Sequence, residues 1–204
     1  MKLLKIFTVS ALLLSAVTVS HAQETPKSKV GIFNSTSFGV KAGANFSTVT
    51  GGSFNESPDY KTGFHAGLVA EIPIADNIFS IQPEVLYSTQ GFKSNDALLG
   101  KSEYKLDYIT VPVLAKLYVV KGLSFEVGPQ MGFKVNEKID LKGADAQVET
   151  NSAKDFEVGV AGGLTFKTDM GLFATGRYTY GLTDTFKNDS AKNSVFQVGL
   201  GFMF

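Results

Sequence analysis

Residues 193–204 read NSVFQVGLGFMF and carry the pattern that decides the fold class. Every second residue is large and apolar: Phe196, Val198, Leu200, Phe202 and Phe204. A period of two is typical of a β-strand, because successive side chains point to opposite faces of a sheet. The stretch is also long enough for a membrane-crossing strand, which needs roughly 9–11 residues. The alternative is the last edge strand of a soluble protein, but so apolar an edge invites aggregation.

The same alternation recurs along most of the chain. Seven earlier stretches show it, at residues 38–46, 63–72, 79–88, 103–118, 123–133, 155–166 and 172–182. Tight turns alternate with long polar connections, which are residues 47–59, 90–102, 134–153 and 183–192. Transmembrane barrels combine short periplasmic turns with long external loops in this way. The sequence therefore predicts an all-β, eight-stranded antiparallel up-and-down transmembrane β-barrel with both termini in the periplasm.

One of these stretches, residues 103–118, is less regular than the others. Its apolar positions change parity near Pro112. Proline cannot donate to the ladder of a sheet and is found mainly at edges and bulges. We therefore expect a β-bulge at this position.

The two faces of the predicted strands differ in charge. One is almost uncharged, whereas the other carries Lys41, Glu71, Gln82, Glu84, Glu126, Gln130, Glu157 and Arg177. An arginine or lysine facing lipid at the midplane costs roughly 2–4 kcal/mol, and water imposes no such cost on a soluble barrel. The apolar face is therefore predicted to meet lipid. Its aromatic residues fit girdles at the two interfaces: Phe38, Phe46, Tyr87, Tyr178, Tyr180 and Phe204.

The first residues of the chain have the features of an export signal. Lys2 and Lys5 precede a mostly apolar segment at residues 6–19, and Ser-His-Ala follows at residues 20–22. This order is typical of a secretory signal peptide cleaved after a small residue. The predicted parts are a cleaved signal peptide at residues 1–22, a periplasmic leader at 23–36 and the outer-membrane barrel at 37–204.

Composition argues against several kinds of site. Positive and negative residues balance, so nothing indicates a nucleic-acid partner. The absence of cysteine excludes disulfides and Cys-based metal sites or nucleophiles. His65, the only histidine beyond residue 22, has lumen parity, whereas a lipid substrate would approach a Ser/His/acid group from the outer wall. We expect no catalytic residue, metal or cofactor.

Four motifs resemble those of the PorT-like outer-membrane β-barrel proteins. They are QPEVLYS at residues 82–88 with Gly91, YITVPVL at 108–114, EVGPQMGF at 126–133 and RYTYGL at 177–182. The resemblance extends over residues 37–204. It implies an eight-stranded barrel in the outer membrane and says little about activity.

The inward polar residues suggest a plugged lumen. Eight strands leave room only for side chains, and buried charges need partners. The lumen network is predicted to be structural and to consist of Lys41, Glu71, Glu84, Glu126, Glu157 and Arg177. The alternatives are a proton or ion path and a carboxylate pair for acid–base chemistry.

The expected role follows from a closed barrel with four external loops. It is structural or a surface interaction, with an envelope protein as the partner of the loops. The alternatives are a narrow channel or transporter for a small solute and, less favoured, a membrane-embedded lipid-modifying enzyme. Outer-membrane lipid and the barrel-assembly machinery, which would recognise the strand ending at Phe204, are the other expected partners.

Overall fold

The computed structural model describes residues 36–52, 58–75, 78–96, 100–141, 146–149, 152–187 and 189–204. The predicted signal peptide and all but the last residue of the leader lie outside them. The strands are β1 (Ser37–Thr50), β2 (Asp59–Ala75), β3 (Phe79–Asp96), β4 (Gly100–Val120), β5 (Leu123–Leu141), β6 (Ala146–Glu149), β7 (Phe156–Lys167), β8 (Leu172–Gly181) and β9 (Lys192–Met203). No helix among the described residues has the length and apolarity needed to cross a membrane.

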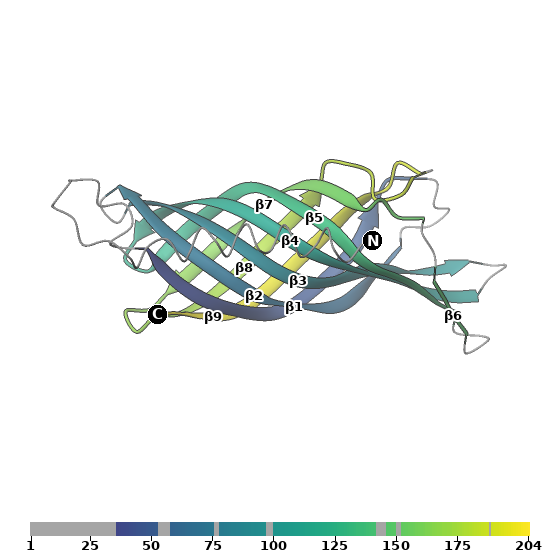
Figure 1. Ribbon diagram of the computed structural model, residues 1–204, viewed down its shortest axis with the longest axis horizontal. Helices are drawn as coiled ribbons and strands as arrows, with labels where there is room; N and C mark the ends of the chain where they lie inside the picture. The colour runs from purple at the N-terminus through teal and green to yellow at the C-terminus, as the bar shows by residue number, and fades with distance from the viewer. Residues whose placement is uncertain are drawn as a thin grey trace, which may run out of the picture. The chain divides into compact units, whose positions relative to one another are not determined.

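The strands form one antiparallel sheet that closes into a barrel (Figure 1). Its order is β4-β3-β2-β1-β9-β8-β7-β5, and an additional pairing of β4 with β5 closes the ring. The short β6 continues the sheet by pairing with the last residues of β5. The predicted eight-stranded antiparallel barrel is confirmed.

The C-terminal strand β9 lies between the first strand, β1, and the preceding strand, β8. It pairs with β1 from Gly39↔Met203 to Thr50↔Lys192, and with β8 on its other side. The backbone N–H of Phe204 donates to the carbonyl of Phe38 at 2.8 Å. A strand at this place has no free edge, which explains how a sequence this apolar is kept from edge-to-edge aggregation.

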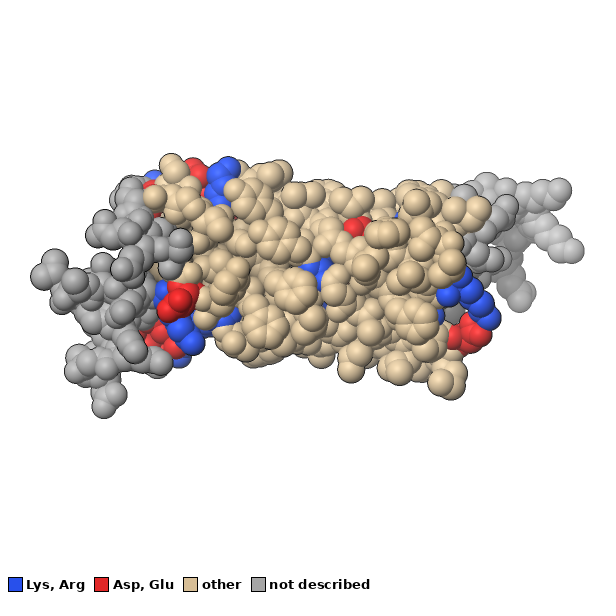
Figure 2. Space-filling model, turned by 180° about the vertical axis from the view of Figure 1, so that it is seen from behind, with Lys and Arg blue, Asp and Glu red and all other residues tan. Residues whose placement is uncertain are grey.

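The outer surface of the barrel is apolar along its middle. Figure 2 shows charged atoms gathered mainly at the two ends, with uncharged residues covering most of the length between them. The predicted outward residues are exposed or half-buried, and Leu200 reaches 64%, whereas the inward Lys41 is 2% exposed. Because charge in lipid is costly, this surface is suited to hydrocarbon.

Several strands are longer than the sequence predicted. β3 and β4 run through most of residues 90–102, and the end of β5 together with β6 occupies much of residues 134–153, so these segments are strands rather than loops. Strand pairing in these segments is made by the backbone and does not require an alternating apolar face. The alternation of side chains therefore gave no signal there.

The predicted bulge at Pro112 is wrong. Pro112 pairs with Gln130 in register, and the irregularities between β4 and β5 lie at Asp107/Tyr108 and Tyr118/Val120 instead. The alternation through Pro112 is unbroken, with Leu114 on the same inward side. The apparent change of parity arose because β4 turns apolar residues inward as well as outward.

Candidate functional site

The centre of the lumen is crossed by a buried arginine. Arg177 on β8 donates from both terminal nitrogens to the Glu84 carboxylate on β3, at 2.7 and 2.8 Å. Its Nε donates to Glu126 on β5 at 2.7 Å. Three strands separate β8 from β3 on either side of the ring, so the side chain links opposite walls. All three side chains are 0% exposed.

Lys41 on β1 completes this central layer. Its Nζ lies 3.6 Å from Glu84 Oε2 and makes no hydrogen bond. Glu126 also accepts a hydrogen bond from Thr165, and Glu84 accepts one from Gln82. The layer thus holds two cations and two carboxylates from alternate strands of the ring. This balance meets the requirement that buried charges be paired and hydrogen-bonded.

A second ionic cluster lies near the end of the barrel that carries the tight turns. Glu71 on β2 accepts hydrogen bonds from Lys116 at 3.1 Å, Lys167 at 2.7 Å and the Tyr118 hydroxyl at 2.6 Å. Glu71, Tyr118 and Lys167 are among the residues that line an open vestibule of ≈ 870 Å³ at this end. Glu71 therefore belongs to this cluster rather than to the layer around Arg177.

His65 lies in a neutral polar layer. Its Nδ1 is 2.8 Å from Asn45 Oδ1, and its Nε2 has no hydrogen-bond partner. Ser88 Oγ instead accepts from the amides of Asn45 and Gln90. Hydrogen bonding therefore places His65 in no Ser/His/acid arrangement. Among the described residues, no group of three or more His, Asp or Glu side chains is placed to hold a metal ion.

Glycines make room for the imidazole. A Cβ on Gly43 would lie 2.7 Å from His65 Cε1, and a Cβ on Gly199 would lie 2.9 Å from Nε2. Gly43 on β1 pairs with His65, and Gly199 on β9 pairs with Gly43 on its far side. Small residues thus provide space for a large one inside a narrow barrel.

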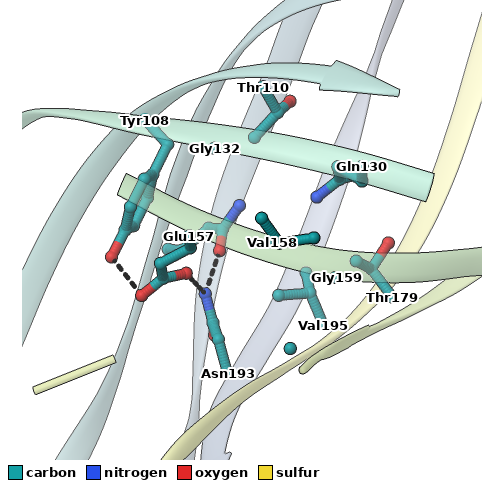
Figure 3. Close-up of a pocket in the computed structure, with 12 residues that line it drawn as sticks. Tyr108, Thr110, Gln130, Gly132, Glu157, Val158, Gly159, Thr179, Asn193 and Val195 are labelled. Carbon is teal, nitrogen blue, oxygen red and sulfur yellow. Dashed lines mark hydrogen bonds between the residues drawn. The ribbon is translucent and has the colours of Figure 1, made fainter. Parts of the chain in front are cut away.

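Glu157 occupies a separate layer nearer the end with the long connections. Its Oε1 accepts a hydrogen bond from the Tyr108 hydroxyl at 2.9 Å, and Oε2 lies 3.5 Å from the donor Asn193 Nδ2 (Figure 3). Tyr108, Glu157 and Asn193 are among the residues that line a small space of ≈ 20 Å³. Glu157 therefore lies in the lumen but does not belong to the central layer, in which Arg177 donates to Glu84 and Glu126.

Aromatic residues pack together beyond this layer, on the side of the long connections. Phe92 on β3 stacks on Tyr104 of β4 with ring centres 4.5 Å apart, and Phe186 meets Phe92 edge-on at 5.9 Å. Val49 and Ala191 complete the cluster. Phe186 lies in the connection between β8 and β9, so this connection folds over the lumen.

Sequence reasoning missed part of the lumen. Lys116, Lys167, Tyr108 and Tyr118 all bind the predicted carboxylates, yet none was singled out. The three residues on β4 share the inward side with Leu114, where apolar and polar residues mix. Counting alternate positions from Tyr108 through Tyr118 would have found these three residues.

Comparison with known proteins agrees with this architecture. The sequence matches the family model described as outer membrane protein beta-barrel domain over residues 21–187. The structure is similar to Neisserial surface protein A (NspA), with 17% identity, a TM-score of 0.56, and coverage of 82% of this chain and 97% of that one. It is also similar to Ail, the attachment invasion locus protein of Yersinia pestis, with 15% identity, a TM-score of 0.51, and coverage of 82% and 98%.

At such identities the structural likeness concerns the fold alone. A comparison with curated proteins gives no significant match. The family match spans most of the barrel. This chain belongs to the outer membrane protein beta-barrel domain family and is an integral β-barrel protein of the outer membrane.

Proposed function

We propose that this barrel is closed to solutes and serves the outer membrane through a structural or surface-interaction role. The observation that carries the proposal is the Arg177 side chain, which bonds to Glu84 across the lumen and to Glu126 while fully buried. A solute would have to displace these charge-assisted hydrogen bonds, which are among the stronger ones in proteins. It would also have to pass the aromatic cluster around Phe92.

The end with the long connections supplies a structured surface for an envelope protein partner. Glu137 at the end of β5 accepts hydrogen bonds from the backbone N–H groups of Ser152 and Ala153. Lys154 donates its backbone N–H to Thr185, which ties this segment to the connection between β8 and β9. A surface that is already ordered loses less conformational entropy on binding.

The β4–β5 projection is also stabilised by charge. Lys105 on β4 forms an ion pair with Asp140 on β5. The hydrogen bond to Asp140 raises the pKa of the Lys105 side chain. Together with the tied connections, this projection would supply recognition at the cell surface.

Several finer assignments accompany the proposal. The four motifs at residues 82–91, 108–114, 126–133 and 177–182 support membership of the PorT-like branch. The alternation of short and long connections supports periplasmic termini and external long connections. The hydrogen bonding of His65 supports a role without catalysis. The exposed apolar residues of the outer surface support membrane lipid rather than nucleic acid as the surroundings of the barrel.

The test is conductance in planar lipid bilayers. The purified wild-type barrel is expected to give no current steps. A variant with Arg177→Ala, Glu84→Ala and Phe92→Ala removes the crossing side chains and part of the aromatic closure, and is expected to give them. Heat-modifiable migration on gels serves as the folding control. Steady wild-type conductance would contradict the closed barrel.

The alternative function is a narrow channel, and the open vestibule at the turn end favours it. The vestibule of ≈ 870 Å³ at the turn end admits a small solute as far as Glu71 and Lys167. A channel would need the central layer to open, so its current should respond to Arg177→Lys. Silence of both proteins at low noise would remove this alternative.

The C-terminal aromatic residue offers a separate prediction about assembly. Phe204 is 75% exposed and extends beyond the last β9 residue. If the assembly machinery binds this end, deleting Phe204 should reduce the folded barrel in outer-membrane fractions several-fold. Phe204→Tyr, which retains an aromatic ring, is the control.

Refolding of the purified variants separates assembly from stability. The Phe204 deletion should refold in detergent nearly as well as wild type, because only the single backbone bond to Phe38 is lost. Equal membrane yields of the deletion and the wild type would refute recognition at this residue.

A further inference from the structure

The layer around Glu157 contains a buried carboxylate without a cationic partner. Glu157 is 8% exposed, and it forms no ion pair with a lysine or arginine in the part of the chain that the structure describes. This sets it apart from the other glutamates of the lumen. Glu71, Glu84 and Glu126 each contact at least one ammonium or guanidinium group. A buried charge without compensation costs several kcal/mol.

The hydrogen bonds of Glu157 favour its charged form. Tyr108 donates to one carboxylate oxygen and Asn193 approaches the other, from two sides of the group (Figure 3). Asn193 is itself held in place by Gln90 Oε1 at 2.5 Å. Donors on both oxygens stabilise a carboxylate rather than a carboxylic acid. Burial opposes this charge, and no lysine or arginine of the described residues forms an ion pair with Glu157 to offset that cost.

The space beside Glu157 has the size and lining for a small cation. Its ≈ 20 Å³ exceeds the roughly 10–15 Å³ that one water molecule needs, and a sodium ion is smaller than water. Thr179 also lines it, and the Thr179 hydroxyl is buried without a hydrogen-bond partner. Gln130 adds a side-chain amide from β5. Oxygen ligands of this kind suit hard cations.

We propose that Glu157 binds a small monovalent cation, with sodium as the probe, in this space. The carboxylate supplies the charge, and Thr179 and Gln130 supply neutral oxygens. The bound cation neutralises the layer below the aromatic cluster. It would stabilise the ends of β7 and β9, from which Glu157 and Asn193 extend, and the connection between β8 and β9.

Thermal unfolding in different salts tests the site. The mature barrel in detergent should unfold roughly 3–6 °C higher in sodium chloride at about ten times its dissociation constant than in N-methylglucamine chloride of equal ionic strength. Glu157→Gln should abolish this difference while retaining a side chain of the same size. Glu71→Gln is the matched control: it removes a lumen carboxylate that already has lysine partners, so the sodium effect should persist.

Two further results would overturn the proposal. One is an equal unfolding temperature of the wild type in the two salts. The other is an infrared band of a protonated carboxylic acid at neutral pH that disappears in Glu157→Gln, because a proton would then occupy the place of the cation. If Glu157→Gln does not fold, Thr179→Val provides the second variant and should weaken the sodium effect without removing a charge.

Discussion

Replacing Arg177 by methionine is expected to lower the free energy of unfolding by about 3–5 kcal/mol, the typical cost of removing one partner from a buried ion pair. The guanidinium donates three hydrogen bonds to Glu84 and Glu126, and all three side chains are fully buried. Without it, two carboxylates share the single ammonium of Lys41. The measurement is denaturant unfolding in phospholipid vesicles, followed by circular dichroism.

Two further variants separate charge from geometry. Arg177→Lys keeps the charge but cannot bond both oxygens of Glu84 while reaching Glu126, so its loss should be smaller than that of Arg177→Met. Arg177→Met with Glu126→Gln leaves Lys41 and Glu84 as one balanced pair, 3.6 Å apart. This double variant should recover part of the loss. Wild-type stability of Arg177→Met would show that the central layer contributes nothing to the fold.

Placing an arginine at Leu200 is expected to destabilise the barrel in bilayers by roughly 2–4 kcal/mol, as for a charge at the midplane. Leu200 is 64% exposed and lies halfway along the outward residues of β9. It pairs with Ala42 on one side and Ala174 on the other. These small neighbours cannot shield an arginine from lipid. Unfolding in vesicles again gives the measurement.

The matched control places the same charge near the end of the wall. Leu172 is the first residue of β8 and is also exposed, next to the tight turn after β7. Leu172→Arg should cost roughly 0–1 kcal/mol, because its guanidinium can reach the interface. Equal losses at the two positions would mean that Leu200 does not face the hydrocarbon core.

The sequence predicted the strands of the barrel and their outward face better than the interactions of the side chains in the lumen. Alternation identified the C-terminal strand and the apolar face, because each strand repeats its pattern locally. Alternation failed in β4, which places the apolar Leu114 and the charged Lys116 on the same inward side. The resulting change of pattern near Pro112 was wrongly interpreted as a bulge. Alternation also missed the strand extensions within residues 90–102 and beyond residue 134, which pair through the backbone without an alternating apolar face.

The candidate site shows a similar division. Parity predicted that Arg177, Lys41 and the glutamates share the lumen, but it could not predict their partners. Arg177 bonds to Glu84, 93 residues earlier in the chain, and not to Glu157. Glu71 instead binds Lys116 and Lys167, which come from β4 and β7.

The sequence by itself determined that this chain spans the outer membrane as strands with an uncharged outer face, because hydrocarbon excludes charge at every outward position. Only the tertiary structure decided which buried charges meet. Closure of β4 on β5 and the stagger of the strands set the height of each side chain along the lumen. At their height, Glu84 and Glu126 form ion pairs with Arg177. At its own height, Glu157 has hydrogen-bond donors and an adjacent space instead of an ion pair.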